Sequence, residues 1–318
     1  MDTKLLYTEF IGSKFQAPLF HRPEWLDAVC GKNGWNAAIC VNGNNVEGVM
    51  PYFFSHPEKT YMTMPVLTPY LGPILNYPDT DKQTSIYSFE KKVLSQLIEQ
   101  LPSHRYFEMK AHPSCSYGLP FHWNQYALAH RFTYKIELNT SLETIFSSFK
   151  SEVRGKIRKA ENAVITAYSD EMSEFLELNK RTFLRQNMEL PYAEHTIQDL
   201  DNVLQNLQAR KILLAKDKEG NVHSSLYLVY DHDTMYVLMA GEDPEFRSSG
   251  AGSLLIYTAI ELAMQMKLKW FDFCGSNIKN IETNRRAYGA QQVPYLFITK
   301  TSGRLQRMKR ALAYLIRG

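Results

Sequence analysis

Hydrophobic and polar positions follow two different periods along this chain, which predicts a mixed α/β protein. Residues 88–101 carry apolar side chains at three- and four-residue spacing, and this period predicts an amphipathic helix. Short apolar runs of strand length surround this helix, at residues 35–41, 46–54, 105–111 and 132–138. The Asn42-Gly43 pair between the first two runs predicts a β-hairpin.

The second half of the chain shows a clearer order of elements. Residues 141–163 predict a basic helix that begins near Ser141 and is interrupted at Gly155. A strand at 164–169 and a helix at 170–187, opening on Ser169 or Asp170, follow. A meander of three strands is predicted next, at 211–217, 222–231 and 234–241. A helix after residue 250, a strand at 269–275, a short helix at 281–290 and a last strand at 293–300 follow.

The length of 318 residues favours two domains, because one hydrophobic core rarely keeps growing to that size. The sequence Leu138–Ser141 separates a strand pattern from a helix cap, so we place the boundary there. The predicted domains are 1–139 and 140–318. Each mixes strands with a central helix, which suits two related domains.

Charge and cysteine content restrict the class of partner and the compartment. A formal net charge of +3 is too small to indicate duplex DNA as a partner. The four cysteines show neither zinc-ligand spacing nor a disulfide framework, so we expect reduced thiols and no metal. The first residues lack the apolar segment of a signal peptide, and no run reaches the roughly 20 apolar residues of a membrane span. A cytoplasmic protein is expected.

The most informative stretch is Arg247-Ser248-Ser249-Gly250-Ala251-Gly252, which stands directly before an apolar helix. Free N–H groups and the positive dipole end make a helix start an anion site, and glycines let a diphosphate approach the backbone. Arg247 and the serines would add donors. The alternative is a strand-to-helix turn whose glycines only permit tight bending.

These residues resemble the coenzyme A diphosphate loop, Arg-x-x-Gly-x-Gly, of the GNAT acyltransferases. Residues 269–290 are similar to the strand, acid and "fG" ending of the Fem-type (FemABX-like) transferases, and Arg154–Ala160 resembles their "R-x-x-I-R-K-A" segment. The long coiled-coil arm of some Fem-type enzymes has no counterpart here.

The resemblance implies an α/β (α+β) fold of two GNAT-like domains, each a mixed, mainly antiparallel twisted sheet flanked by helices. The acceptor would lie in the groove between the domains. An acyl-CoA, such as acetyl-CoA, would bind at the second domain's loop, with its carbonyl beside the edge of the strand that ends at Gly241. The residues implied in donor binding are Leu238, Met239, Ala240, Arg247, Ser248, Ser249, Gly250, Ala251, Gly252 and Ser253.

Amide formation requires groups that take and supply protons. The candidates are Tyr288 in the predicted short helix, Asp272 in an apolar strand, and Glu242 just before the loop. Packing of an ordinary buried tyrosine explains Tyr288 equally simply, and Asp272 reads first as a structural anchor.

Acceptor binding has weaker candidates. Arg154, Lys156 and Arg158 on the basic helix would bind phosphate of a nucleotide-linked amine or of tRNA, or else form a solvated face with nearby glutamates. Tyr70, in the proline-rich segment 64–75, would line the acceptor groove or pack between elements. The basic amphipathic segment 303–318 would dock on the protein or touch an anionic membrane surface.

The sequence therefore predicts an N-acyltransferase that moves an acyl group directly from acyl-CoA to an amine. Two alternatives stay open. One is an aminoacyl-tRNA-dependent transferase that extends a cell-wall peptide precursor, and the other is a non-catalytic binding protein in envelope or polysaccharide assembly.

Overall fold

The computed structural model describes residues 2–14, 17–55, 58–185, 187–275 and 278–303. The chain forms two compact units, one of residues 1–131 and 294–318 and the other of residues 132–293. The predicted division into domains 1–139 and 140–318 stays a prediction. Most of the basic segment 303–318 lies outside the described residues.

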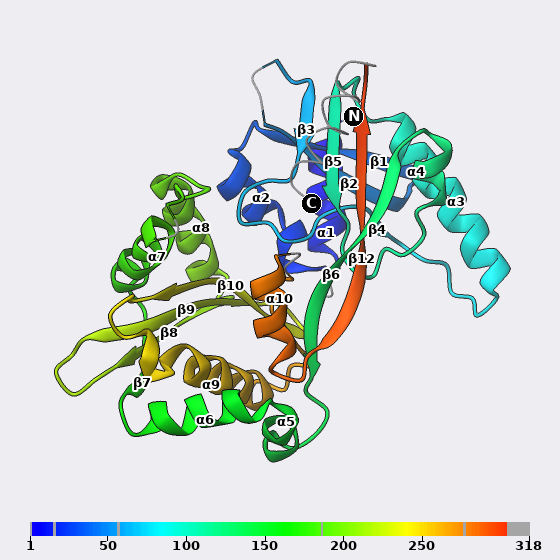
Figure 1. The fold of residues 1–318 in the computed structure, drawn as a ribbon. Coiled ribbons are helices and arrows are strands. Elements are labelled where there is room, and N and C mark those ends of the chain that lie inside the picture. Colours follow the sequence, from blue (N-terminus) through cyan, green and yellow to red (C-terminus); the bar gives the residue numbers. More distant parts are fainter. Residues whose placement is uncertain (1, 15–16, 56–57, 186, 276–277, 304–318) are drawn as a thin grey trace. The chain divides into compact units, whose positions relative to one another are not determined.

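The first unit is built on a mainly antiparallel sheet (Figure 1). Its strand order is β1-β2-β3-β5-β12, with β4 paired to β2. Among the described strand pairs of this unit, β3–β5 is parallel and the others are antiparallel. Asn42 pairs with Asn45 at the end of β1 and β2, so the predicted hairpin is confirmed. The strands are β1 (Trp35–Asn42), β2 (Asn45–Phe54), β3 (Tyr61–Thr63), β4 (Ile74–Leu75), β5 (Tyr106–Lys110) and β12 (Gln291–Thr301).

Helices complete this unit. The predicted helix 88–101 is α3, and it buries Val93, Leu94, Leu97 and Ile98 in one cluster with residues of β1, β2 and β5. The sequence prediction did not include the two N-terminal helices. The elements are α1 (Thr3–Gly12), a 3-10 turn η1 (Leu19–His21), α2 (Pro23–Cys30), α3 (Gln83–Glu99) and α4 (Leu119–Trp123).

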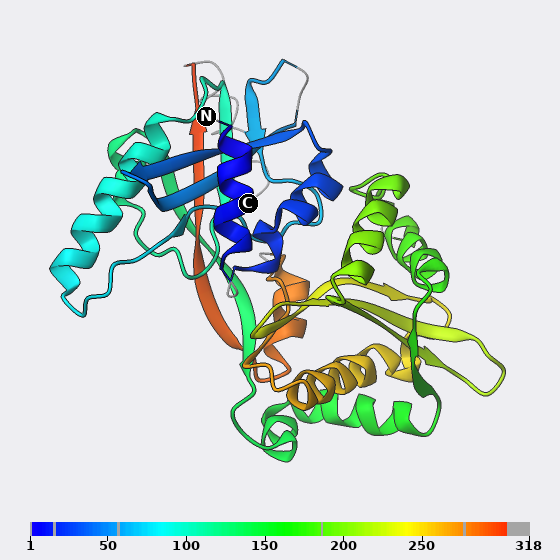
Figure 2. The same ribbon diagram turned by 180° about the vertical axis from the view of Figure 1, so that it is seen from behind.

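The second unit has the strand order β6-β11-β10-β9-β8-β7. Among its described pairs, β10–β11 is parallel and the others are antiparallel. The helices α7 and α8 lie on one face of this sheet, and α9 and α6 lie on the other (Figures 1 and 2). The strands are β6 (Ala127–Glu137), β7 (Ile165–Ser169), β8 (Arg210–Lys216), β9 (Val222–Tyr230), β10 (Thr234–Glu242) and β11 (Trp270–Asp272). The helical elements are α5 (Leu142–Ser148), α6 (Ser151–Glu161), α7 (Ser173–Arg185), α8 (Glu194–Asn206), the 3-10 turn η2 (Arg247–Ser249), α9 (Ala251–Gln265) and α10 (Lys279–Arg286). The expected fold class, mixed α/β with a mainly antiparallel sheet and flanking helices, is confirmed.

The basic helix differs from the prediction in one detail. Ser141 caps it as expected, since its hydroxyl accepts the amide of Thr144. The break falls at Phe149 and Lys150, and the predicted break at Gly155 is wrong. Phe149 is extended and nearly fully buried, so the chain leaves helical geometry to place that ring in the core. An added Cβ at Gly155 would meet open space, so nothing there disturbs α6.

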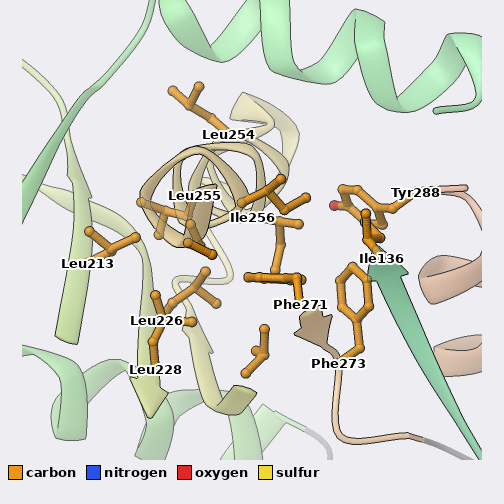
Figure 3. Close-up of a cluster of buried hydrophobic side chains, with 14 of the residues drawn as sticks. Ile136, Leu213, Leu226, Leu228, Leu254, Leu255, Ile256, Phe271, Phe273 and Tyr288 are labelled. Atoms are coloured by element: carbon orange, nitrogen blue, oxygen red, sulfur yellow. The ribbon is translucent and has the colours of Figure 1, made fainter. Parts of the chain in front are cut away.

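The core of the second unit lies between α9 and the sheet. Figure 3 shows Leu255 and Ile256 of α9 facing Leu226 of β9 and Phe271 of β11. The side chain of Phe271 is fully buried and contacts Phe273 edge to face, at 5.2 Å between ring centroids. Burial of this apolar layer fixes the start of α9 relative to the ends of the strands. Among the described residues, no helix is long and apolar enough to span a bilayer.

Phe271→Ala should lower the free energy of unfolding of the second unit by about 3–5 kcal/mol, because it removes a fully buried ring and leaves a cavity. Urea unfolding followed by circular dichroism measures this change. The control is Tyr168→Ala on the edge strand β7, where the side chain is 60% exposed and the expected change is within about 0.5 kcal/mol. Equal losses in the two variants would contradict the assignment of the core.

Candidate functional site

The strands β10 and β11 separate after a short contact, and this separation creates the site. They pair only from Thr234–Trp270 to Tyr236–Asp272, where β11 ends. β10 continues for six residues to Glu242, with an irregularity against β9 between Val237 and Met239. One edge of β10 therefore has no strand neighbour beyond Tyr236 among the described residues.

A cavity of about 570 Å³ lies beside this open edge, within the second unit. The start of α9, the end of β10 and the C-terminal part of α10 line it. Of the residues predicted to act, those that line it are Lys156, Ala240, Glu242, Arg247, Ser248, Gly250, Gly252, Ser253 and Tyr288. Leu238, Met239, Ser249, Ala251, Arg154, Arg158, Asp272 and Tyr70 are not among the lining residues.

The start of α9 has the features of an anion site. The hydroxyl of Ser249 accepts the amide of Ala251 at 3.2 Å, which satisfies one of the first free N–H groups of the helix. Among the described residues, no acceptor is recorded for the amides of Gly250 and Gly252. The helix dipole adds positive potential at the same place, so an anion in the cavity would find both donors and charge.

The two loop glycines serve different purposes. Gly250 has φ +83°, and a Cβ there would stand 2.3 Å from the carbonyl oxygen of Lys156, so this glycine lets α6 approach the loop. The close approach of α6 is thus sufficient to require glycine at position 250, and the expected contact of Gly250 with a diphosphate stays a prediction. At Gly252 an added Cβ would have its nearest neighbour at 3.4 Å, the hydroxyl of Ser224, so the backbone is open toward the cavity.

The charged groups at the cavity rim are mostly paired. Glu242 Oε2 accepts from Arg247 Nε at 2.9 Å and lies 3.6 Å from Arg185 Nη1. Lys156 Nζ lies 2.6 Å from Glu152, and both side chains are at least half exposed, so a ligand can compete for this lysine.

The rest of the basic helix contributes to the fold. Arg154 Nη1 donates to the carbonyls of Ser147 and Phe149, which closes the end of α5. Lys159 Nζ donates to the carbonyl of Ser248 at 2.6 Å and so ties α6 to the loop. The guanidinium of Arg158 lies 6.0 Å from the ring centroid of Phe146.

Tyr288 follows α10 and is 3% exposed. Its hydroxyl donates to Ser253 Oγ at 3.1 Å, which places it at the first turn of α9. Figure 3 shows the ring beside Phe273 and Ile256. Burial, the largest cause, raises the pKa of this phenol, while the Ser253 hydrogen bond and Arg285 oppose the rise. The hydroxyl therefore keeps its proton at neutral pH.

Asp272 is fully buried beneath the site, at the end of β11. It accepts from Thr133 Oγ1 at 2.5 Å and from the amide of Cys274 at 2.8 Å, and it lies 3.5 Å from Lys135 Nζ. Burial raises the pKa of this carboxyl, and Lys135 and the hydrogen bonds counteract that effect. These contacts join β11 to β6 and hold the turn where β11 ends.

Sequence reasoning missed Arg285, Asn284, Ser224 and Thr182, which also line the cavity. Arg285 Nε is buried without a hydrogen-bond partner, and its guanidinium lies 5.0 Å from the ring centroid of Phe273. Burial lowers the pKa of this guanidinium. The spacing of three residues between Arg285 and Tyr288 was a usable signal, because the predicted short helix 281–290 would have placed both on one face.

Tyr70 belongs to the first unit and is fully buried. Its ring contacts Tyr295 at 5.2 Å, His112 at 5.9 Å and Phe20 at 6.2 Å between centroids. The side chain packs between elements of that unit. Its predicted contact with an acceptor stays a prediction.

Among the described residues, one group of side chains has the chemistry of metal ligands. Ligand atoms of Asp231, His232 and Asp233 lie within 4.8 Å of one another at the turn between β9 and β10, at the end of β10 away from the cavity. Asp231 already accepts from the amide of Thr234 and the hydroxyl of Tyr236. The expected absence of a metal stays a prediction.

Comparison with known proteins finds a domain model that covers part of this site. A family model described as an acetyltransferase (GNAT) domain matches residues 147–286. This range includes the loop, the open edge of β10 and all of α10. A search of the curated proteins finds no match to the sequence.

The fold of the chain is similar to that of several solved structures. A crystal structure of FemX is 14% identical, with a TM-score of 0.67, covering 94% of this chain and 96% of that one. The C-terminal domain (DUF2156) of a putative lysylphosphatidylglycerol synthetase from Agrobacterium fabrum is 9% identical, with a TM-score of 0.60, covering 98% and 95%. L-PGS from Bacillus licheniformis is 10% identical, with a TM-score of 0.54, covering 89% of each chain.

Gly250→Ala and Gly252→Ala should differ sharply in stability. The first forces a side chain into left-handed geometry and against the Lys156 carbonyl, so it should cost more than about 1–2 kcal/mol. The second fits and replaces a helical glycine, so its free energy of unfolding should be equal or higher by up to about 1 kcal/mol. Thermal and urea unfolding measure both, and a stable Gly250→Ala protein would disprove the described loop geometry.

Proposed function

We propose that this chain, a Fem-like acyltransferase of the GNAT superfamily, takes its acyl group from acyl-CoA and transfers it directly to an amine. The observation that supports this donor best is the pair of glycine amides at the start of α9, inside a cavity whose other wall is the open edge of β10. A diphosphate fits the first feature, and an acyl arm fits the second.

The diphosphate would accept hydrogen bonds from the amides of Gly250 and Gly252. Arg247 and Lys156 stand at the rim with exposed side chains and would add charge. Ser248 and Ser253 offer hydroxyls on either side. Since these donors are in position before any ligand binds, binding an anion here requires little rearrangement of the backbone.

In the transfer step, the amine nitrogen attacks the thioester carbonyl carbon, the C–N bond forms and the C–S bond breaks. The amine loses a proton and the departing sulfur gains one. Tyr288 keeps its proton at neutral pH and is the group we assign to protonate the sulfur. Glu242 carries the carboxylate at the cavity that we assign to take the amine's proton.

Negative charge develops on the carbonyl oxygen during the attack. A backbone amide on the open edge of β10 would stabilise it, as would the unpartnered donor of Arg285. Asp272 has no contact with the cavity and acts through β11, whose end it holds.

An aminoacyl group on tRNA is the second candidate donor. It is favoured by the likeness of the fold to FemX and to lysylphosphatidylglycerol synthetases over nine-tenths of the chain. Such a donor was expected to use the basic helix, but Arg154 and Lys159 of that helix donate to backbone carbonyls. The acyl-CoA donor is therefore preferred. A cytoplasmic location, where acyl-CoA is made and thiols stay reduced, suits it.

Desulfo-CoA at one hundred times its dissociation constant should stabilise the protein by about 2.7 kcal/mol. The binding should be lost in Gly252→Val, whose added side chain points into the cavity. Calorimetric titration and thermal unfolding measure both effects. The control is Gly155→Ala on the exposed side of α6, which should bind as the original protein does. An unmoved melting temperature at saturating ligand would reject the donor.

Tyr288→Phe should reduce the rate of thiol release from acetyl-CoA in the presence of an amine by about 10²–10⁴-fold, because it removes the proton source for the sulfur. Desulfo-CoA affinity should stay nearly the same, since the diphosphate contacts remain. A dye that reacts with free thiols follows the release, with a panel of primary amines as acceptors. Unchanged release in the variant would assign that proton to another group.

A further inference from the structure

Side chains of α7 form hydrogen bonds with backbone groups on the open edge of β10. Asn179 Nδ2 donates to the carbonyl oxygen of Ala240 at 2.9 Å. Two residues further along β10, Thr182 Oγ1 accepts the amide of Glu242 at 2.9 Å. Beyond Tyr236, no strand among the described residues lies on this side of β10, so α7 supplies partners that a neighbouring strand would otherwise supply.

Asn179 has only one orientation that satisfies its surroundings. It is 2% exposed, and its Oδ1 accepts the hydroxyl of Tyr192 at 2.5 Å. A carbonyl can only accept, so the NH₂ group must face Ala240. Burial raises the pKa of Tyr192 to about 12, so this phenol remains a donor at neutral pH.

The distance between α7 and β10 leaves little freedom. An added Cβ at Gly241 would lie 2.8 Å from the Cβ of Leu178 and 2.9 Å from the amide nitrogen of Asn179. The helix backbone therefore lies directly on the strand at Gly241. Tyr192, Asn179 and the Ala240 carbonyl form a continuous hydrogen-bonded chain across this contact.

These hydrogen bonds determine which backbone N–H and C=O groups at this edge remain available to a ligand. Within a strand, the N–H and C=O groups of one residue point to the same side. The amide of Ala240 therefore points to the same side of β10 as its carbonyl, which is already satisfied by Asn179. Ala240 is also one of the residues that line the cavity. A free carbonyl there would repel a thioester oxygen.

We propose that Asn179, held by Tyr192, is a positioning residue that turns the Ala240 amide toward the thioester carbonyl of the donor. This proposal rests on the acyl-CoA donor proposed above. Neither side chain touches the acyl group. The Ala240 carbonyl belongs to the peptide group shared with Gly241, and the Ala240 amide belongs to the one shared with Met239, so the Asn179 hydrogen bond acts by fixing the backbone of Ala240 between these two groups. It thereby orients a hydrogen bond whose value grows as charge develops on the oxygen.

The test compares CoA with acetyl-CoA labelled with carbon-13 at the carbonyl, in the original protein, Tyr192→Phe and Asn179→Asp. Infrared difference spectra report the hydrogen bond to the bound thioester carbonyl as a shift to lower frequency. The shift should be present in the original protein, smaller in Tyr192→Phe and absent in Asn179→Asp, whose carboxylate repels the Ala240 carbonyl. The affinity for CoA should stay within about threefold, because its contacts lie at the start of α9.

Tyr7→Phe is the matched control, since it removes a buried hydroxyl that donates 2.6 Å to the carbonyl of His21 in the first unit. It should leave the carbonyl band unmoved, and thermal unfolding should show all variants folded. If Asn179→Asp does not fold, Tyr192→Phe alone decides. The same carbonyl shift in Tyr192→Phe as in the original protein would overturn the positioning role while leaving the donor intact. A failure of the original protein to bind CoA would instead reject the donor, and the proposal with it.

Discussion

The early separation of β10 and β11 is the constraint on which the site depends. β11 ends at Asp272 because its buried carboxylate is taken by Thr133 and by the amide of Cys274. The chain then turns at Gly275, where φ is +68° and a Cβ would stand 2.6 Å from the carbonyl oxygen of Phe132. β10 continues without this partner, and its edge beyond Tyr236, which has no strand neighbour among the described residues, becomes a cavity wall. A sheet that stayed paired would leave no room for an acyl arm.

Two kinds of positive group meet at this cavity. The amides at the start of α9 are fixed by the backbone and cost no side-chain entropy when they bind. The side chains are less free than the sequence suggests, because Lys159 and Arg154 hold backbone carbonyls and Arg247 is paired with Glu242. Arg285 differs, since its buried Nε has no partner. Arg285 is also one of the residues that line the cavity.

The likeness to FemX and to the lysylphosphatidylglycerol synthetases, at 9–14% identity, describes the fold. The choice between a CoA thioester and an aminoacyl ester depends on local chemistry. A helix start with bare glycine amides suits a compact diphosphate, whereas a polynucleotide needs an extended surface of free cations. On α6, Arg154 and Lys159 already hold backbone carbonyls. We therefore give the chemistry at the start of α9 more weight than the overall likeness of the fold.

Periodicity and turn residues were sufficient to predict the elements of strongest pattern, such as α3, the hairpin at Asn42 and the meander of β8, β9 and β10. The helices α1, α2, α4 and α8 were missed. The first two lie before the first segment assigned from its pattern, and α8 is a largely polar helix with buried Ile197, Leu200 and Leu204.

The sequence by itself determined that a flexible, donor-rich loop precedes an apolar helix, because that property resides in adjacent residues. Tertiary structure alone decided what each residue of the loop does. Gly250 has to lack a side chain because α6 comes from a distant part of the chain to contact it, and the guanidinium of Arg285 lies against the ring of Phe273. The partners of Asn179, at Ala240 and Tyr192, were equally invisible in the sequence, since hydrogen bonds between distant segments leave no local pattern.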